Sequence, residues 1–309
     1  MLKKKIPADK THSQTIETDV LIIGGGVTGT GVLRDLALRG LQSLLIDRKD
    51  LCAGASGGNH GLLHSGCRYV SNDLHAAIEC REESNILKNV ASQCIKQTGG
   101  LFVAVKGDTP EFAESFADLC KPAGISCEQI AVTEARKIEP LLSEHIFKAY
   151  EVPDATIDPF RLALLNVAHA RTLNDSGYRP HTEVLRFIIK DGTITEAVCR
   201  DNRTHSLVTI RASQYVNASG AWAMNIAQLA GCSDVSLLYS KGTLLVSHDR
   251  LTTRVINRLR PPSDGDILVP GGTVSVLGTT SIRVDDLDAV KPTMNEIDKY
   301  IREGTAMMP

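Results

Sequence analysis

The chain has 309 residues, of which 42% are hydrophobic and 23% charged, and this balance is ordinary for a globular protein of about two domains. A formal net charge of −2 gives no sign of nucleic-acid binding. The eight cysteines include no C-x-x-C pair, so the sequence indicates neither a zinc site nor an iron–sulfur cluster.

The first 17 residues are polar and contain no apolar core of the kind that a signal peptide needs. We expect residues 1–17 to form a mobile tail that is neither a signal peptide nor a membrane span. No later run is apolar over the length of a membrane helix, so we expect membrane contact only at the periphery or through partners.

Residues 19–23, DVLII, form a short apolar run that predicts a buried parallel strand. Gly24, Gly26 and Gly29 follow in a G-x-G-x-x-G pattern, which permits a tight turn and a close approach of backbone to a pyrophosphate. Free amides at the start of the next helix would hold the phosphates. A flexible loop between two core elements is the alternative interpretation.

The residues after this pattern favour nucleotide binding over a loop. Apolar side chains recur at helical spacing over residues 32–37, Gly40 is placed to end that helix, and residues 43–46 predict a second strand. Asp47 ends the strand about 20 positions after the middle glycine, where a carboxylate can accept both ribose hydroxyls of an adenosine. Together these features predict a dinucleotide-binding unit.

The segment over residues 51–70, LCAGASGGNHGLLHSGCRYV, is rich in small and polar residues and is poorly suited to an ordinary helix. Such a segment can run extended across a cofactor and place His64, Arg68 and Tyr69 beside it. It resembles the FAD-dependent glycerol-3-phosphate dehydrogenases of the D-amino-acid oxidase superfamily, and NHGLLHSGCRY is most similar to the catalytic subunits of the anaerobic branch. Residues 216–222, VNASGAW, resemble the superfamily's second cofactor motif V-N-A-A-G-x-W.

The resemblance implies an α/β fold in which a Rossmann-like FAD-binding domain of the glutathione-reductase type carries an inserted α+β substrate domain. We expect residues 18–95 and 151–235 to form the FAD-binding domain, and residues 96–150 and 236–309 to form the substrate domain. Periodicity predicts a helix over residues 73–94 and further helices that begin at Pro110, Thr133, Asp158 and Thr293. Apolar runs and turn signals predict strands over 99–105, 182–189, 193–200, 206–211 and 214–217. From residue 236 onward the sequence predicts mainly strands.

The glycine motif and the resemblance together give an expected set of FAD contacts. Its members come from the glycine turn, the end of the second strand, the segment that follows and the second motif: Gly24, Gly25, Gly26, Thr28, Gly29, Asp47, Arg48, Ser56, Gly61, Leu62, Val184, Ala218, Gly220 and Trp222. No metal ligand is expected.

Four residues are candidates for the chemistry. By resemblance, Arg68 and Tyr69 line the substrate pocket, with Arg68 as a ligand of a phosphate or hydroxyl group; a structural ion pair is the alternative for Arg68. His64 is suited to accept a proton from an alcohol, or else it only packs near the flavin. Lys241, in a turn resembling the family's K-G-S turn, could supply a second cation, or else it is an exposed lysine.

The resemblance implies oxidation of sn-glycerol 3-phosphate to dihydroxyacetone phosphate. Iron–sulfur and membrane-anchor partner subunits would carry the electrons to quinone, and the chain would be cytoplasmic and peripheral to the inner membrane. Two alternatives remain open: another flavoprotein oxidoreductase acting on amino acids or 2-hydroxy acids, and an inactive truncated fragment. The resemblance covers only the N-terminal part of the family's chain, without its later G-x-R-P and G-G-K motifs, so the fragment is expected to aggregate and to retain flavin weakly.

Overall fold

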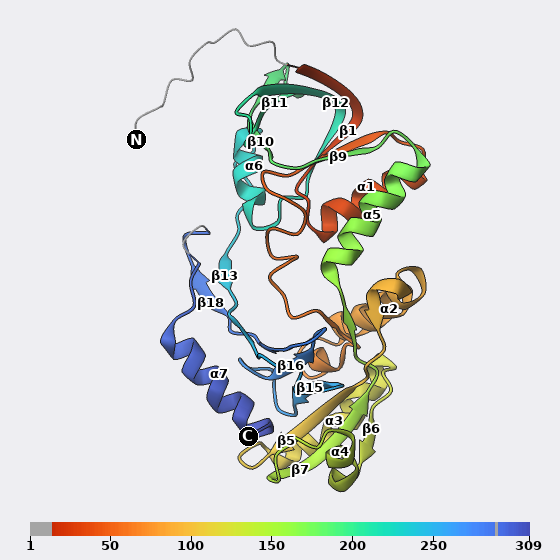
Figure 1. The fold of residues 1–309 in the computed structure, drawn as a ribbon, viewed down its shortest axis with the longest axis vertical. Coiled ribbons are helices and arrows are strands. Elements are labelled where there is room, and N and C mark those ends of the chain that lie inside the picture. Colours follow the sequence, from red (N-terminus) through yellow and green to blue (C-terminus); the bar gives the residue numbers. More distant parts are fainter. Residues whose placement is uncertain (1–13, 288–289) are drawn as a thin grey trace. The chain divides into compact units, whose positions relative to one another are not determined.

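The computed structural model describes residues 14–287 and 290–309, and these residues divide into two compact units (Figure 1). Unit 1 contains the described residues up to Gly58 together with residues 159–237, and unit 2 contains residues 59–158 and 238–309. Residues 59–95 and 151–158, which we expected in the FAD-binding domain, therefore belong to unit 2. The reason is packing, because Cys67 and Ala77 share a buried cluster with Phe102 of unit 2. In addition, β3 Leu62–Leu63 and β4 Ile95–Lys96 both pair with β8 Ala155–Ile157.

Unit 1 is built on a six-stranded sheet with the order β10-β11-β12-β1-β2-β9. The central strand β1 is parallel to β12 on one side and to β2 on the other, whereas β10, β11 and β12 form an antiparallel meander. The strands are β1 Gln14–Ile23, β2 Ser43–Ile46, β9 Gly177–Arg179, β10 Thr182–Lys190, β11 Thr193–Asp201 and β12 Leu207–Asn217.

Two expectations for this sheet are corrected. The predicted tail over residues 1–17 is wrong for its last four residues, because β1 begins at Gln14 and pairs with β12 from there; residues 1–13 lie outside the described residues. The strands predicted over 206–211 and 214–217 are one continuous strand, β12. Continuous pairing of β12 with β1 keeps the intervening residues extended.

Alternating side chains of β1 pack into two different hydrophobic cores. Val20 and Ile22 pack with α1 Val27–Leu38 and α5 Pro159–Leu173, which run side by side in Figure 1. Leu21 packs on the opposite side, against residues of β10 and β11, with α6 Ala223–Leu229 also contributing. This division follows from the two-residue period of a strand, which sends successive side chains to opposite faces.

Unit 2 is built on a seven-stranded sheet with the order β14-β17-β16-β15-β5-β7-β6. Only β5 and β15 are parallel to each other, and the other neighbours are antiparallel. The strands are β5 Gly100–Val105, β6 Glu128–Ile130, β7 Ile146–Val152, β14 Leu244–Val246, β15 Val255–Arg258, β16 Ile267–Pro270 and β17 Ser275–Gly278. Sequence patterns did not predict β15.

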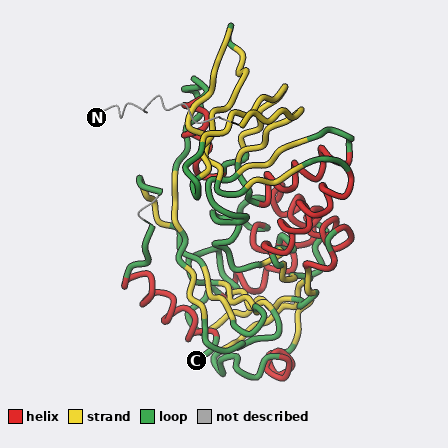
Figure 2. The backbone as a smooth tube through the Cα atoms, turned by 45° about the horizontal axis from the view of Figure 1, so that its top comes forward, coloured by secondary structure: helices red, strands yellow, loops and turns green. Residues whose placement is uncertain are grey.

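The seven-stranded sheet also has a core on each face. Phe102 of β5 packs with Phe116 of α3 Pro110–Cys120, whereas Leu101 packs with Tyr300 of α7 Met294–Met307. Figure 2 shows the strands gathered into sheets with helices beside them. The remaining elements of unit 2 are α2 Leu74–Val90, α4 Val132–Ile138, the 3-10 turns η1 Cys67–Tyr69, η2 Ser92–Cys94 and η3 Lys121–Ala123, and the pair β13 Tyr239–Lys241 with β18 Ile282–Val284.

Among the helices of the described residues, none combines the length and the apolar character that crossing a membrane requires.

Candidate functional site

The turn between β1 and α1 has no room for side chains at two of its glycines. A Cβ atom on Gly24 would lie 2.3 Å from the carbonyl oxygen of Ala218, and Gly24 has a φ of +118°. A Cβ atom on Gly29 would lie 1.9 Å from the carbonyl oxygen of Gly24. Glycine is therefore required here by both space and conformation, and the turn stays open to a ligand at the start of α1.

Gly26 and Ser56 meet at the N-terminus of α1. Gly26 is the N-cap residue and makes no side-chain cap, whereas the amide of Val27 donates to Oγ of Ser56 at 3.0 Å. A Cβ atom on Gly26 would lie 2.9 Å from that Oγ. Ser56, which was predicted as a cofactor contact, thus closes one side of the phosphate-sized space at the helix terminus.

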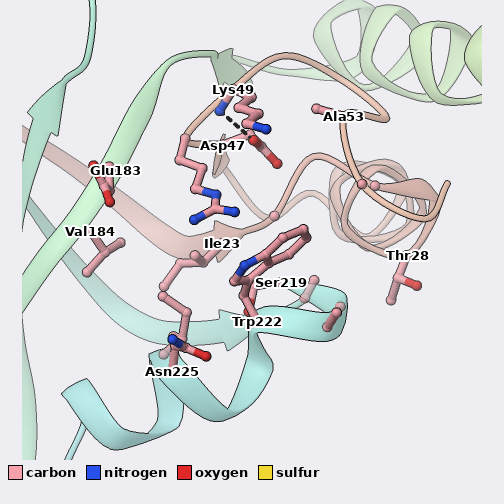
Figure 3. A pocket seen from close by; sticks show the side chains of 18 of the residues that line it. Ile23, Thr28, Asp47, Lys49, Ala53, Glu183, Val184, Ser219, Trp222 and Asn225 are labelled. Atoms are coloured by element: carbon pink, nitrogen blue, oxygen red, sulfur yellow. Dashed lines mark hydrogen bonds between the residues drawn. The ribbon is translucent and has the colours of Figure 1, made fainter. Parts of the chain in front are cut away.

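Asp47 stands at the end of β2, as predicted. Its Oδ2 accepts a hydrogen bond from the amide of Gly25 at 2.7 Å. Its Oδ1 accepts one from the amide of Lys49, also at 2.7 Å (Figure 3). These bonds fix the carboxylate between the glycine turn and the following loop. Each oxygen retains a further lone pair, which is the acceptor that a ribose hydroxyl needs.

Trp222 lies in the 3-10 turn η4 Gly220–Trp222, which leads from β12 into α6. The guanidinium carbon of Arg48 lies 4.3 Å from the centre of its indole ring. A cation over an aromatic face at this distance is attracted to the ring. The two side chains therefore form one wall of the space beyond Asp47.

These groups surround a cavity of about 570 Å³ in unit 1, a size typical of ligand pockets, which span roughly 300–1,000 Å³. Figure 3 shows its labelled side chains coming from separate segments: Thr28 from α1, Val184 from β10, and Trp222 from the turn after β12. Ten predicted cofactor contacts line the cavity: Gly24, Gly26, Thr28, Asp47, Arg48, Ser56, Val184, Ala218, Gly220 and Trp222.

The other four predicted cofactor contacts lie elsewhere. Gly25 and Gly29 support the turn behind the cavity, and Gly61 and Leu62 belong to unit 2, at β3. Several other lining residues were not among the predicted contacts: Ser219 lies inside the second motif beside the residues that were chosen, whereas others, such as Asn225, reach the cavity only through folding. These unpredicted lining residues include Ile23, Lys49, Ala53, Glu183, Ser219 and Asn225.

A second group of predicted residues lies together in unit 2. The ring of His64 is 5.7 Å from the ring of Tyr69 and 6.5 Å from that of His60. Burial lowers the pKa of His64, although the charge of Asp154 opposes the shift. Burial, with His64 and Arg68 nearby, lowers the pKa of His60 to about 4. His64 is therefore a neutral imidazole at pH 7, the form that accepts a proton.

Arg68, in η1, forms a structural ion pair, as the alternative interpretation of this residue expected. Its Nη2 donates to the carbonyl oxygen of Ser263 at 2.9 Å and lies 3.4 Å from Oδ2 of Asp266. These contacts hold one edge of the guanidinium group. The opposite edge of the Arg68 guanidinium group remains available to bind a ligand.

The environment of Lys241 matches neither of the two interpretations of this residue. Its ammonium group donates to Oε2 of Glu296 at 2.6 Å and to the carbonyl oxygen of Lys291, and its side chain is buried. It is thus neither an exposed turn lysine nor a cation available to a substrate, because Glu296 already neutralises it. Among the described residues, no three His, Cys, Asp or Glu side chains are grouped to bind a metal ion.

Comparison with known proteins gives a family match. The family model described as DAO, FAD dependent oxidoreductase, matches residues 19–309. The chain is 42% identical over 294 residues to a subunit of the anaerobic glycerol-3-phosphate dehydrogenase of Escherichia coli K12, with 94% of this chain and 54% of the relative covered. The chain thus spans about half the length of the curated relatives that it matches.

Solved structures share the fold. L-proline dehydrogenase from P. horikoshii superposes with a TM-score of 0.79 at 19% identity, over 96% of this chain and 78% of that one. The glycerol-3-phosphate dehydrogenase from Bacillus halodurans, solved with FAD, gives a TM-score of 0.68 at 21% identity, over 95% and 53%. At these identities the likeness concerns the fold alone.

Proposed function

Because the chain belongs to the DAO family of FAD-dependent oxidoreductases, we propose that it binds FAD and oxidises sn-glycerol 3-phosphate to dihydroxyacetone phosphate. The substrate assignment rests on the 42% sequence identity between this chain and a relative named for glycerol-3-phosphate dehydrogenation. The chain spans about half of that relative, so the activity is a proposal for this chain. The His64, Arg68 and Tyr69 cluster supports it.

The residues of unit 1 fit FAD. The glycine turn has no space for a Cβ atom at Gly24 or Gly29, and the N-terminus of α1 beyond Gly26 would hold the pyrophosphate. Asp47 has acceptor capacity for the ribose hydroxyls. Arg48 and Trp222 would form a wall of the site. When bound, FAD supplies the acceptor for the two electrons taken from the alcohol.

The residues of unit 2 supply what the alcohol requires. His64 carries a neutral imidazole whose lone pair can accept the hydroxyl proton, and its pKa is lowered by burial. Arg68 would bind the phosphate group through the edge that faces away from Asp266. Tyr69, packed against His64, would fix the orientation of the imidazole ring.

Electron transfer beyond the flavin requires partners. The E. coli relative is named as one subunit of its enzyme, and we assign to this chain iron–sulfur and membrane-anchor partner subunits that pass electrons to quinone. Such an assembly would hold the chain on the cytoplasmic side of the inner membrane. Co-purification of the chain with those subunits in a membrane fraction, lost after a salt wash that releases peripheral proteins, tests this assignment.

The activity is tested by mixing FAD-loaded protein with substrates under anaerobic conditions. Glycerol 3-phosphate should bleach the visible absorbance of the flavin, whereas glycine, L-proline and lactate should leave it unchanged. The Arg68→Ala variant should bleach roughly ten- to a thousandfold more slowly at equal flavin content. Bleaching by an amino acid but not by glycerol 3-phosphate would place the chain among the other oxidoreductases of the superfamily.

A further inference from the structure

Arg68 has donors that the described protein does not use. Its side chain is only 14% exposed, yet only Nη2 of its guanidinium group contacts an acceptor among the described residues. A guanidinium group carries five N–H donors, so the groups on Nε and Nη1 remain without a partner in the described part of the chain. Neither nitrogen is among the fully buried atoms that lack a partner, so both can meet solvent, and an anionic acceptor can take the place of water there.

Asp266 fixes the edge of Arg68 that is occupied. Its side chain is fully buried, and its Oδ2 accepts from the amide of Ser263 at 2.6 Å while lying 3.4 Å from Nη2 of Arg68. Ser263 in turn accepts from the same Nη2 through its carbonyl oxygen. The loop between β15 and β16 thus holds the guanidinium group of Arg68 at two points, one on a side chain and one on the backbone. These two contacts fix its orientation.

The same carboxylate holds a second guanidinium group. Oδ1 of Asp266 accepts from Nε of Arg260 at 3.0 Å, and Arg260 also lies 3.0 Å from Oε2 of Glu303 on α7. The Arg260 side chain is 20% exposed, and no acceptor for its Nη1 is present among the described residues. Arg68 and Arg260 are therefore neighbours, and each presents unused donors.

We propose that Asp266 is a positioning residue that orients Arg68 and Arg260 as a two-guanidinium site for the phosphate group of the substrate. This inference rests on the proposed function, and Arg260 takes the place that the sequence suggested for Lys241. Nearby, Arg258 pairs with Asp108 and Glu303, so Arg68, Arg258 and Arg260 are balanced by three carboxylates, and the exposed Arg302 adds one positive charge beside Glu303. Oriented N–H donors, rather than net charge, would then select a phosphate group.

The test follows chemical modification of Arg68 by phenylglyoxal, with each modified arginine identified by peptide mass spectrometry. In the FAD-supplemented chain, inorganic phosphate and glycerol 3-phosphate should both slow the modification of Arg68 and Arg260, and glycerol should not. In Asp266→Asn the phosphate concentration that gives half protection should rise about tenfold, because the guanidinium groups lose their charged anchor.

Glu139→Gln is the matched control, because Glu139 is also a buried carboxylate, and its partners are Thr253 and the amide of Arg254 rather than Arg68 or Arg260. It should lower the thermal stability as Asp266→Asn does and leave the half-protecting phosphate concentration unchanged. The proposal is overturned if phosphate does not protect Arg68, or if both variants weaken protection equally. If phosphate protects and Asp266→Asn alone weakens it, the site stands even where glycerol 3-phosphate fails to bleach the flavin.

Discussion

At the scale of single residues, the glycines of the nucleotide turn serve different physical purposes. Gly24 combines a positive φ with a backbone contact that forbids any Cβ atom, so it shapes the turn itself. Gly26 has an ordinary φ of −78°, and only the proximity of Ser56 restricts it. Gly31, further along α1, has open space where a Cβ atom would lie: apart from its chain neighbours and the backbone of its own helix, no heavy atom of the described residues lies within 4 Å.

This difference yields a matched pair of variants. Gly26→Val should abolish FAD binding, because its side chain would collide with Ser56 or occupy the space for the pyrophosphate. Gly31→Val makes the same substitution in the same helix without a collision, and it should keep the flavin. Flavin content after purification in the presence of FAD measures both. Equal flavin content in the two variants would contradict a pyrophosphate site beside Gly26.

Trp222 is the only tryptophan of the chain, and it lines the cavity beneath Arg48. Its fluorescence should therefore fall as FAD fills the cavity, and the titration should saturate at one FAD per chain. Arg48→Ala should weaken the binding, since it removes one wall of the site. Arg250→Ala in unit 2 is a control for the loss of an arginine. Unquenched fluorescence in protein shown by dialysis to hold FAD would contradict the placement of Trp222.

At the scale of elements, one carboxylate joins α7 to the strands of unit 2. Glu296 lies in the first turn of α7 and forms a capping box with the N-cap residue Thr293. It also accepts hydrogen bonds from Lys241 of β13, Thr243 and Thr280. The capping box was readable from local spacing, whereas the other partners come from distant parts of the chain. Glu296 thus fastens the helix to the sheet through a buried, fully partnered charge.

Lys241→Met should destabilise unit 2 by about 3–5 kcal/mol, because it leaves the buried carboxylate of Glu296 without its cation. Lys299→Met removes a lysine of α7 that pairs with Asp264 at 35% exposure, and it should cost only about 0–1 kcal/mol. Urea unfolding measures both. Equal losses would mean that the ion pair of Lys241 is no more important than a surface pair.

The same carboxylate makes stability depend on pH. Burial opposes ionisation of Glu296, but hydrogen bonds from Lys241, Thr243 and Thr280 outweigh it and hold its pKa well below the ordinary value. A depressed pKa in the folded state stabilises the fold at pH values above the unfolded pKa of about 4.3, and this contribution is lost as the pH falls. The urea midpoint should therefore drop between pH 6 and pH 3, and less steeply in Glu296→Gln. Equal slopes for both proteins would remove Glu296 as the cause.

At the scale of the whole molecule, each unit has its own sheet with a core on either face. The cavity that we propose for FAD is lined entirely by residues of unit 1. Calorimetry should resolve two unfolding transitions, and saturating FAD should raise the one that belongs to unit 1 more than the other, because a ligand stabilises the structure that binds it. Hydrogen exchange of β10 and β15 peptides assigns the transitions. A single transition raised as a whole by FAD would show that the units unfold together.

The sequence alone determined the local elements that surround the proposed nucleotide site. The strand over 43–46 was predicted with its observed bounds, the helix of residues 32–37 lies within α1, and Asp47 stands at the strand end as expected. These features are local: a glycine turn, a two-residue or helical period and a short spacing to an acid each depend on neighbours in the chain. The family was recognisable from the segment over 51–70 and from the motif over 216–222, and it is confirmed by the match over 19–309.

Only the tertiary structure decided which residues meet across long separations. Sequence patterns did not reveal that β15 pairs with β5, that Arg68 shares Asp266 with Arg260, or that Lys241 is neutralised by Glu296. A charged side chain has the same local signature whether it awaits a substrate or faces a buried carboxylate. Its partner is chosen when the chain packs, since burying a charge is tolerable only beside an opposite one.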